Sequence, residues 1–164
     1  MARKTKRIRT NTAVLIVVEG QTEDAYFSQM KTFERFRNLS INIRTAPHSN
    51  PQSVLGYAID EVRENHGVYD VVWCVFDWDV VVRDNLYAKI KPLIKALNSQ
   101  GGIVISSFPS IEVWFLTHYR VPNVLYHDQS GVITDLIKYL PDYCKEGDWM
   151  TRRGLYAKLK PLQK

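Results

Sequence analysis

Two uninterrupted apolar runs, residues 14–18 and 71–76, constrain the fold of this chain more than any other feature of its sequence. A strand with one face in water alternates apolar and polar residues, whereas a strand of a parallel sheet is buried on both faces and is apolar throughout. The two runs therefore predict neighbouring central strands of a parallel sheet.

Helical and strand-like patterns alternate along the rest of the chain. After the first run, apolar residues recur at helical spacing from Thr22, which we expect to cap the helix. Residues 41–45 alternate in polarity, as a half-exposed edge strand does, and Asn50 is placed to cap a second helix.

The second half of the chain continues this order. A third helix is expected to open at Asp84 or Asn85 and to be kinked or split by Pro92, which removes a backbone donor. A strand at 103–107 and a helix from Ser110 follow. The order of elements predicts a doubly wound α/β fold, with a mainly parallel sheet of about four strands flanked by helices.

The length of 164 residues suits one domain, which we place at 12–164. No apolar run approaches the ~20 residues that span a bilayer, and no signal peptide is evident, so a cytoplasmic location is expected. The net charge of +5 comes from residues 1–11, since the remainder carries 17 basic and 17 acidic residues.

Residues 1–11 form a basic arm that contains no acid. Such an arm can neutralise phosphates on nucleic acid, or it can be a solvated, disordered leader, and the sequence leaves both open. Its candidate nucleic-acid-binding residues are Arg3, Lys4, Lys6, Arg7 and Arg9.

Carboxylates follow both apolar runs. Glu19 ends the first, and Asp77 and Asp79 follow the second. If the two strands are adjacent and parallel, these side chains meet at one edge of the sheet, where ligands bind in open α/β folds. Two like charges ~4 Å apart repel by about 4 kcal/mol at an effective dielectric near 20, so this trio predicts a site for Mg²⁺ or Mn²⁺.

Each acid also has a purely structural explanation, because acidic residues often end an apolar run or stabilise the start of a helix. Two acids separated by one residue are a weak pattern by themselves. The occurrence of Glu19 and of the Asp77 and Asp79 pair on the two most apolar strands favours a functional site.

Three motifs occur in order along the chain: EGQTE at 19–23, FDWD at 76–79 and SFPSIEVWFLTH at 107–118. They resemble the EGxTE, FDxD and SNPxFExWxLxH motifs of the RloB family, which is found beside restriction–modification and abortive-infection genes. A late Tyr156 and Lys158 also match.

The resemblance implies a Toprim-like fold and a metal-dependent nuclease of prokaryotic phage defence that works with an ATPase partner. It implies that Glu19 is a general acid or base and that Asp77 and Asp79, with Glu19, bind Mg²⁺ or Mn²⁺. It also implies that the domain is shortened at its C-terminus, because the chain stops before the family's usual last helix.

Three further residues are second-tier candidates: Glu23, Glu112 and His118. The helix dipole also explains two of them, because it favours an acid such as Glu112 near the start of a helix and a histidine such as His118 near the end.

Two other functions remain open from the sequence. The acidic cluster and the arm could form a non-catalytic module that binds nucleic acid or a partner protein. The same carboxylates could instead serve an enzyme acting on a nucleotide or another small phosphate. Whether the substrate is DNA or RNA is also open.

Overall fold

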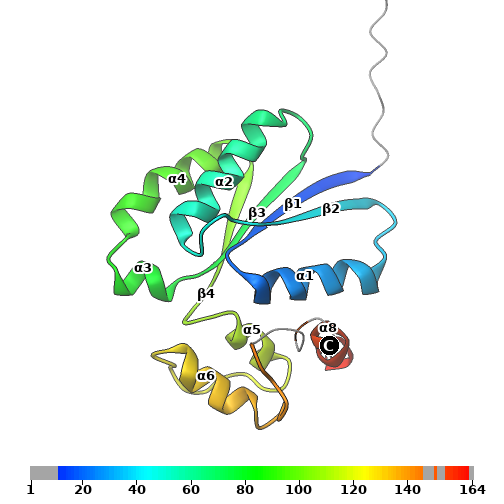
Figure 1. The fold of residues 1–164 in the computed structure, drawn as a ribbon, viewed down its shortest axis with the longest axis vertical. Coiled ribbons are helices and arrows are strands. Elements are labelled where there is room, and N and C mark those ends of the chain that lie inside the picture. The colour runs from blue at the N-terminus through cyan, green and yellow to red at the C-terminus, as the bar shows by residue number, and fades with distance from the viewer. Residues whose placement is uncertain (1–10, 146–149, 151–153, 163–164) are drawn as a thin grey trace, which may run out of the picture.

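The computed structural model describes residues 11–145, 150 and 154–162, and Figure 1 shows their arrangement. Four parallel strands form one sheet in the order β2-β1-β3-β4. The α/β fold with a parallel sheet flanked by helices is thus confirmed, as is the edge position of the second strand. The strands are β1 Thr12–Val18, β2 Leu39–Thr45, β3 Val71–Asp77 and β4 Gly102–Ser107.

Helices cover both faces of the sheet. Alternate residues of β1 and β3 point in opposite directions, so Leu15 and Cys74 pack with α2 (Pro51–Glu64) and α4 (Tyr87–Ser99), whereas Ile16 faces α1 (Gln21–Glu34). These side chains have no exposed surface. The uninterrupted apolar runs are therefore explained by burial on both faces of the sheet.

Helix starts were predicted with mixed success. The Asn50 side chain accepts a 2.8 Å hydrogen bond from the Ser53 N–H, which confirms that it caps α2. The prediction that Thr22 caps α1 is wrong, because α1 begins at Gln21 with Gly20 at the capping position. The backbone N–H of Glu23 lowers the pKa of that residue's own carboxyl group, although burial raises this pKa overall.

The predicted third helix is two helices. A short helix, α3 (Asp79–Arg83), follows β3 directly, and α4 starts only at Tyr87, not at Asp84 or Asn85. The break lies at Asn85, whose φ of 49° is left-handed and ends the helical path. The predicted split at Pro92 is absent, since α4 runs through this residue at the cost of one backbone donor.

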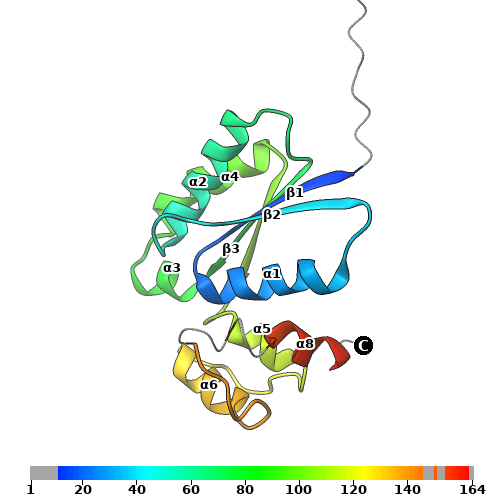
Figure 2. The same cartoon turned by 45° about the vertical axis from the view of Figure 1, so that its right-hand side comes forward.

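A third group of helices lies at the carboxyl ends of the strands, beneath α1 (Figure 2). A separate apolar cluster joins Ala25 and Tyr26 of α1 to this group. Its members are α5 (Glu112–Thr117), α6 (Gln129–Leu136), α8 (Leu155–Leu159) and a 3₁₀ turn at Lys160–Leu162. No helix in the described part of the chain is long and apolar enough to cross a bilayer.

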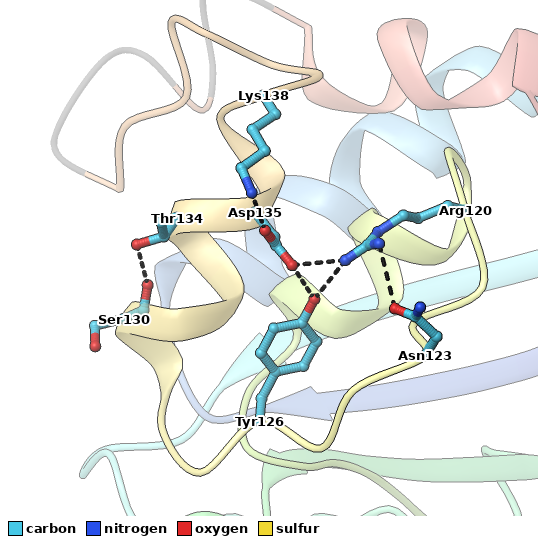
Figure 3. Close-up of polar contacts among 7 residues, drawn as sticks. All are labelled: Arg120, Asn123, Tyr126, Ser130, Thr134, Asp135 and Lys138. Carbon is cyan, nitrogen blue, oxygen red and sulfur yellow. Dashed lines mark hydrogen bonds and ion pairs between the residues drawn. The ribbon is translucent and has the colours of Figure 1, made fainter.

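One polar network fixes α6 against the segment that precedes it (Figure 3). Asp135 of α6 accepts from Arg120 Nη2 at 2.6 Å and from the Tyr126 hydroxyl at 2.5 Å. Lys138 lies 2.5 Å from the other carboxylate oxygen. Hydrogen bonds from Lys138 and Tyr126 lower the pKa of Asp135 to about 2.

We predict that Asp135→Asn lowers the melting temperature at neutral pH and removes part of the acid sensitivity of the fold. Because the folded pKa of Asp135 is about 2 and its ordinary value is 3.8, its ionised form stabilises the folded chain above that ordinary value. This contribution is lost as the pH falls through about 2. Thermal melts across acidic pH test this.

The matched control is Asp60→Asn, which removes a 3.7 Å ion pair with Arg63 between two exposed side chains. An exposed pair contributes little, so this variant should melt like the unaltered chain. Equal acid sensitivity in the Asp135 variant and the unaltered chain would contradict the prediction.

Candidate active site

The carboxyl ends of β1 and β3 bring Glu19 and Asp77 together, as their adjacency in the sheet requires. Val18 pairs with Val75 in the register, and the Glu19 N–H extends this pairing by donating to the Val75 carbonyl at 3.1 Å. The Asp77 N–H then donates to Glu19 Oε2 at 3.1 Å. The Ser49 hydroxyl lies 3.4 Å from Glu19 Oε1, so both carboxylate oxygens of Glu19 have a donor.

The turn after Glu19 carries a second carboxylate into the same site. Glu23 is only 5% exposed, although it lies in the first turn of α1 where acids commonly face water. A side chain at Gly20 would place its Cβ 3.3 Å from Glu23 Oε2, a tight contact. Glycine after Glu19 therefore allows the backbone to lie close to the buried Glu23.

Glu112, at the start of α5, is fully buried. Its Oε1 accepts a 2.7 Å hydrogen bond from the Tyr143 hydroxyl and lies 2.9 Å from Lys145 Nζ. Its Oε2 accepts from the Gln129 amide at 3.2 Å. Two segments of the chain, at 143–145 and at the start of α6, therefore converge on this one carboxylate.

The four carboxyl groups are electrostatically coupled. Burial, followed by the charges of Glu23, Glu112 and Glu19, raises the pKa of Asp77 to about 8. Burial also raises the pKa of Glu19 and of Glu23. Glu112 differs: burial would raise its pKa, but Lys145 and the hydrogen-bond donors around the carboxylate hold it below the ordinary value.

The comparison with known families identifies this chain. A family model described as "RloB-like protein" matches residues 14–160, which is most of the sequence and includes all four carboxyl groups. The chain belongs to the RloB-like family. No curated protein and no solved structure matches it.

Asp79 of this RloB-like chain lies at the rim of the acidic cluster. It is the first residue of α3, its side chain is 33% exposed, and it lies 3.8 Å from Arg83. Its negative charge nevertheless contributes to raising the pKa of Glu19. Of the two aspartates in the FDWD motif, only Asp77 is therefore embedded among the other carboxylates.

Other candidate residues lie apart from the cluster. His118 packs edge-on against Trp114, and burial alone lowers its pKa, so no charge of the cluster acts on it. Tyr156 donates to Glu34, and Lys158 contacts Asp142. The basic residues Arg3, Lys4, Lys6, Arg7 and Arg9 lie outside the described part of the chain.

Lys145 is the residue of this site that sequence reasoning missed. Its ammonium opposes the raised pKa values of Glu19, Glu23 and Asp77, and it pairs directly with Glu112. It lies in a polar stretch without helical or strand periodicity, 33 residues after Glu112 along the chain. No sequence signal marks it, because its role depends on the folding of the C-terminal segment onto α5.

The donor chemistry of the cluster fits a hard divalent cation, which prefers carboxylate oxygens. One lysine acts on four carboxyl groups, and the raised pKa values show that the remaining negative charge is not balanced. Among the residues that the structure describes, however, no three His, Cys, Asp or Glu side chains are arranged to hold a metal ion. The side chains are thus gathered but are not in coordinating positions.

We predict that Asp77→Asn stabilises the metal-free chain increasingly as the pH rises. The folded pKa of about 8 lies above the ordinary value of 3.8, so ionising Asp77 costs free energy in the folded state between these values. Asparagine cannot ionise, and the advantage of the variant should grow by at most about 1.4 kcal/mol per pH unit before it levels off above about pH 8.

Denaturant titrations in a chelating buffer at several pH values measure this difference in the free energy of unfolding. Asp60→Asn, on the exposed surface of α2, is the control and should show no such trend. If the difference between Asp77→Asn and the unaltered chain is independent of pH, Asp77 is not the group with the raised pKa.

Proposed function

We propose that this RloB-like protein is a Toprim-like nuclease that cleaves phosphodiester bonds with Mg²⁺ or Mn²⁺. The observation that carries the proposal is the cluster of four coupled carboxyl groups around Lys145, at the edge of the sheet where α/β folds bind ligands. Clusters of perturbed acids are typical of catalytic sites.

Glu19 suits the role of general acid or base. Burial raises its pKa above the ordinary value, as is common for catalytic carboxyl groups. The Asp77 N–H holds Oε2, and Oε1 has only the longer contact from Ser49. Proton transfer would therefore take place at Oε1.

Asp77 and Asp79, with Glu19, would hold the metal ion. When bound, such an ion stabilises negative charge on phosphate oxygens and activates water. Asp77 lies inside the cluster and Asp79 at its rim, so the ion would lie towards the solvent side. Glu112 and Lys145 would act as positioning residues, because Glu112 has no exposed surface and its ion pair fixes the ammonium beside the site.

The biological setting is part of the proposal and rests on the family alone. It comprises a cytoplasmic role in prokaryotic phage defence, at loci associated with abortive infection or restriction–modification, and an ATPase partner.

One observation favours a second candidate function, a non-catalytic module that binds nucleic acid or a partner protein. The described carboxylates are not arranged to hold a metal ion, and Lys145 already compensates Glu112. This alternative predicts binding without metal-dependent cleavage, whereas the nuclease proposal requires cleavage.

We predict metal-dependent cleavage of labelled DNA or RNA that falls at least about 100-fold in Glu19→Gln, the lower range for loss of a general acid or base. Asp77→Asn should show a similar loss, which higher Mn²⁺ concentrations partly restore. Gel analysis of initial rates at several metal concentrations is the measurement.

The control for Glu19→Gln is Glu64→Gln, the same substitution at an exposed residue of α2. It should cleave at the unaltered rate. Cleavage that persists in both site variants would remove Glu19 and Asp77 from the mechanism. Absence of cleavage in the unaltered chain, with binding retained, would favour the non-catalytic module.

We also predict that Mn²⁺ stabilises the fold without any substrate. At ~100 times its dissociation constant, a ligand that binds only the folded state adds about 2.7 kcal/mol to the free energy of unfolding. Asp77→Asn should reduce this gain, whereas Asp60→Asn should retain it. Thermal melts with Mn²⁺ and with chelator measure it, and identical melts would argue against a metal site.

A further inference from the structure

A basic and aromatic surface lies at the far end of α1 from the carboxylates. It comprises Lys31, Phe33, Arg35, Phe36 and Arg37, which we call the α1-end patch. All five are exposed, and the two phenylalanine rings expose 50% and 38% of their surface. Exposed aromatic rings between cations form the kind of surface on which the bases of single-stranded nucleic acid stack.

The positive charge of the patch is not neutralised by its neighbours. The ion pairs between described residues do not include Lys31, Arg35 or Arg37. Glu34 is the only acid in this segment, and it is engaged elsewhere: it lies 2.8 Å from Lys160 Nζ and accepts from Tyr156. The three cations of the patch are therefore available to an anionic ligand.

Two adjoining hollows, together called the depression, lie along α1 between Lys31 and Phe33 of the patch and Lys145. A hollow of about 410 Å³ runs along α1 from Gln21 and Lys145 to Thr32 and Phe33. A second hollow of about 260 Å³ adjoins it at Thr32 and includes Lys31. The first hollow ends at Lys145, which pairs with Glu112, so one residue separates the depression from the carboxylate cluster.

Between its ends, the first hollow is lined by Asp24, Ser28, Gln29 and Thr45. The hydroxyls of Ser28 and Thr45 donate to the Asp24 carboxylate, and the Gln29 amide donates to the Met150 carbonyl, so the positive charge that attracts phosphates is supplied by the α1-end patch and not by this stretch. The 14 residues of α1 span about 21 Å.

The predicted basic arm joins the fold beside the patch. The Thr12 N–H donates to the Asn38 carbonyl at 2.9 Å, so β1 begins next to the residue that follows Arg37. Figure 1 shows α1 running back beside the sheet towards the start of β1. The start of β1 therefore lies beside the α1-end patch.

We infer that the depression along α1 binds a single-stranded segment of nucleic acid and leads it from the α1-end patch to the carboxylate site. Phosphates contact Lys31, Arg35 and Arg37, and unpaired bases stack on Phe33 and Phe36. The inference rests on the proposed function for the identity of the substrate, but its test needs binding only.

The test is fluorescence anisotropy of a labelled single-stranded 12-mer in a chelating buffer, over a series of salt concentrations. The triple variant Lys31→Gln, Arg35→Gln, Arg37→Gln should bind more weakly, and its log–log salt slope should be shallower by about 2, at ~0.7 per lost phosphate contact. The control triple Lys89→Gln, Lys91→Gln, Lys95→Gln removes the same charge from the exposed side of α4, across the sheet. Its slope should be unchanged.

The contribution of the two phenylalanine rings to binding is measured separately. Phe33→Ala and Phe36→Ala should each weaken binding of the single strand at least about fivefold and leave binding of a duplex of the same length unchanged, because paired bases cannot stack on them. Tyr87→Ala, which removes a 53% exposed ring from α4, is the control. Melting curves confirm that each variant is folded.

Equal losses in the patch and control triples would overturn the inference, since they would show a general effect of net charge. So would unchanged binding in the patch triple, or the absence of salt-dependent binding by the unaltered chain. Binding that follows the predicted pattern without any cleavage would support nucleic-acid binding along α1 and would reject the nuclease proposal. The binding inference and the nuclease proposal can therefore fail separately.

Discussion

The buried charge of Glu112 is the constraint on which the arrangement of the site depends. A carboxylate with no exposed surface must be paired and hydrogen-bonded, because an uncompensated charge in the interior costs several kcal/mol. Here Tyr143 and Lys145, on the segment after α6, and Gln129, at the start of α6, supply the compensation. An apolar cluster packs the C-terminal helices at the carboxyl edge of the sheet, and the ion pair with Glu112 holds Lys145 among the acids.

Lys145 forms a direct ion pair with Glu112, whereas it acts on Glu19, Glu23 and Asp77 only through longer-range electrostatic attraction. This division explains why the pKa of Glu112 lies below its ordinary value while those of Glu19, Glu23 and Asp77 lie above theirs. A divalent cation held as proposed by Glu19, Asp77 and Asp79 would compete with protons for Glu19 and Asp77. In the absence of a cation, protonation of Asp77 relieves the repulsion, so protonation and metal binding are alternative solutions to one electrostatic problem.

The fold was largely predictable because its signals are local. The apolar runs at 14–18 and 71–76 determined the central strands, and their adjacency placed Glu19 against Asp77. The Asn50 cap was correct for the same reason, since a cap depends on three or four consecutive residues. The break at Asn85 was missed because a left-handed residue within a polar stretch has no apolar periodicity to mark it.

The site was predictable only in part, because half of it depends on tertiary contacts. Glu23 looked like an ordinary acid at the start of a helix, and only its burial places it in the cluster. Lys145 had no signal at all, and His118, which matched the motif, packs away from the acids. The three motifs therefore contained all four carboxyl groups of the cluster, but they also included His118, which lies apart, and did not include Lys145.

The two ends of α1 carry opposite charge, and the helix dipole accounts for part of this distribution. Acids in the first turn and a lysine in the last turn each stabilise a helix. The dipole acts only within these turns, so it does not explain Arg37, which lies beyond the helix, or the exposed ring of Phe36. Their exposed surface is the feature that the inferred binding of nucleic acid would explain.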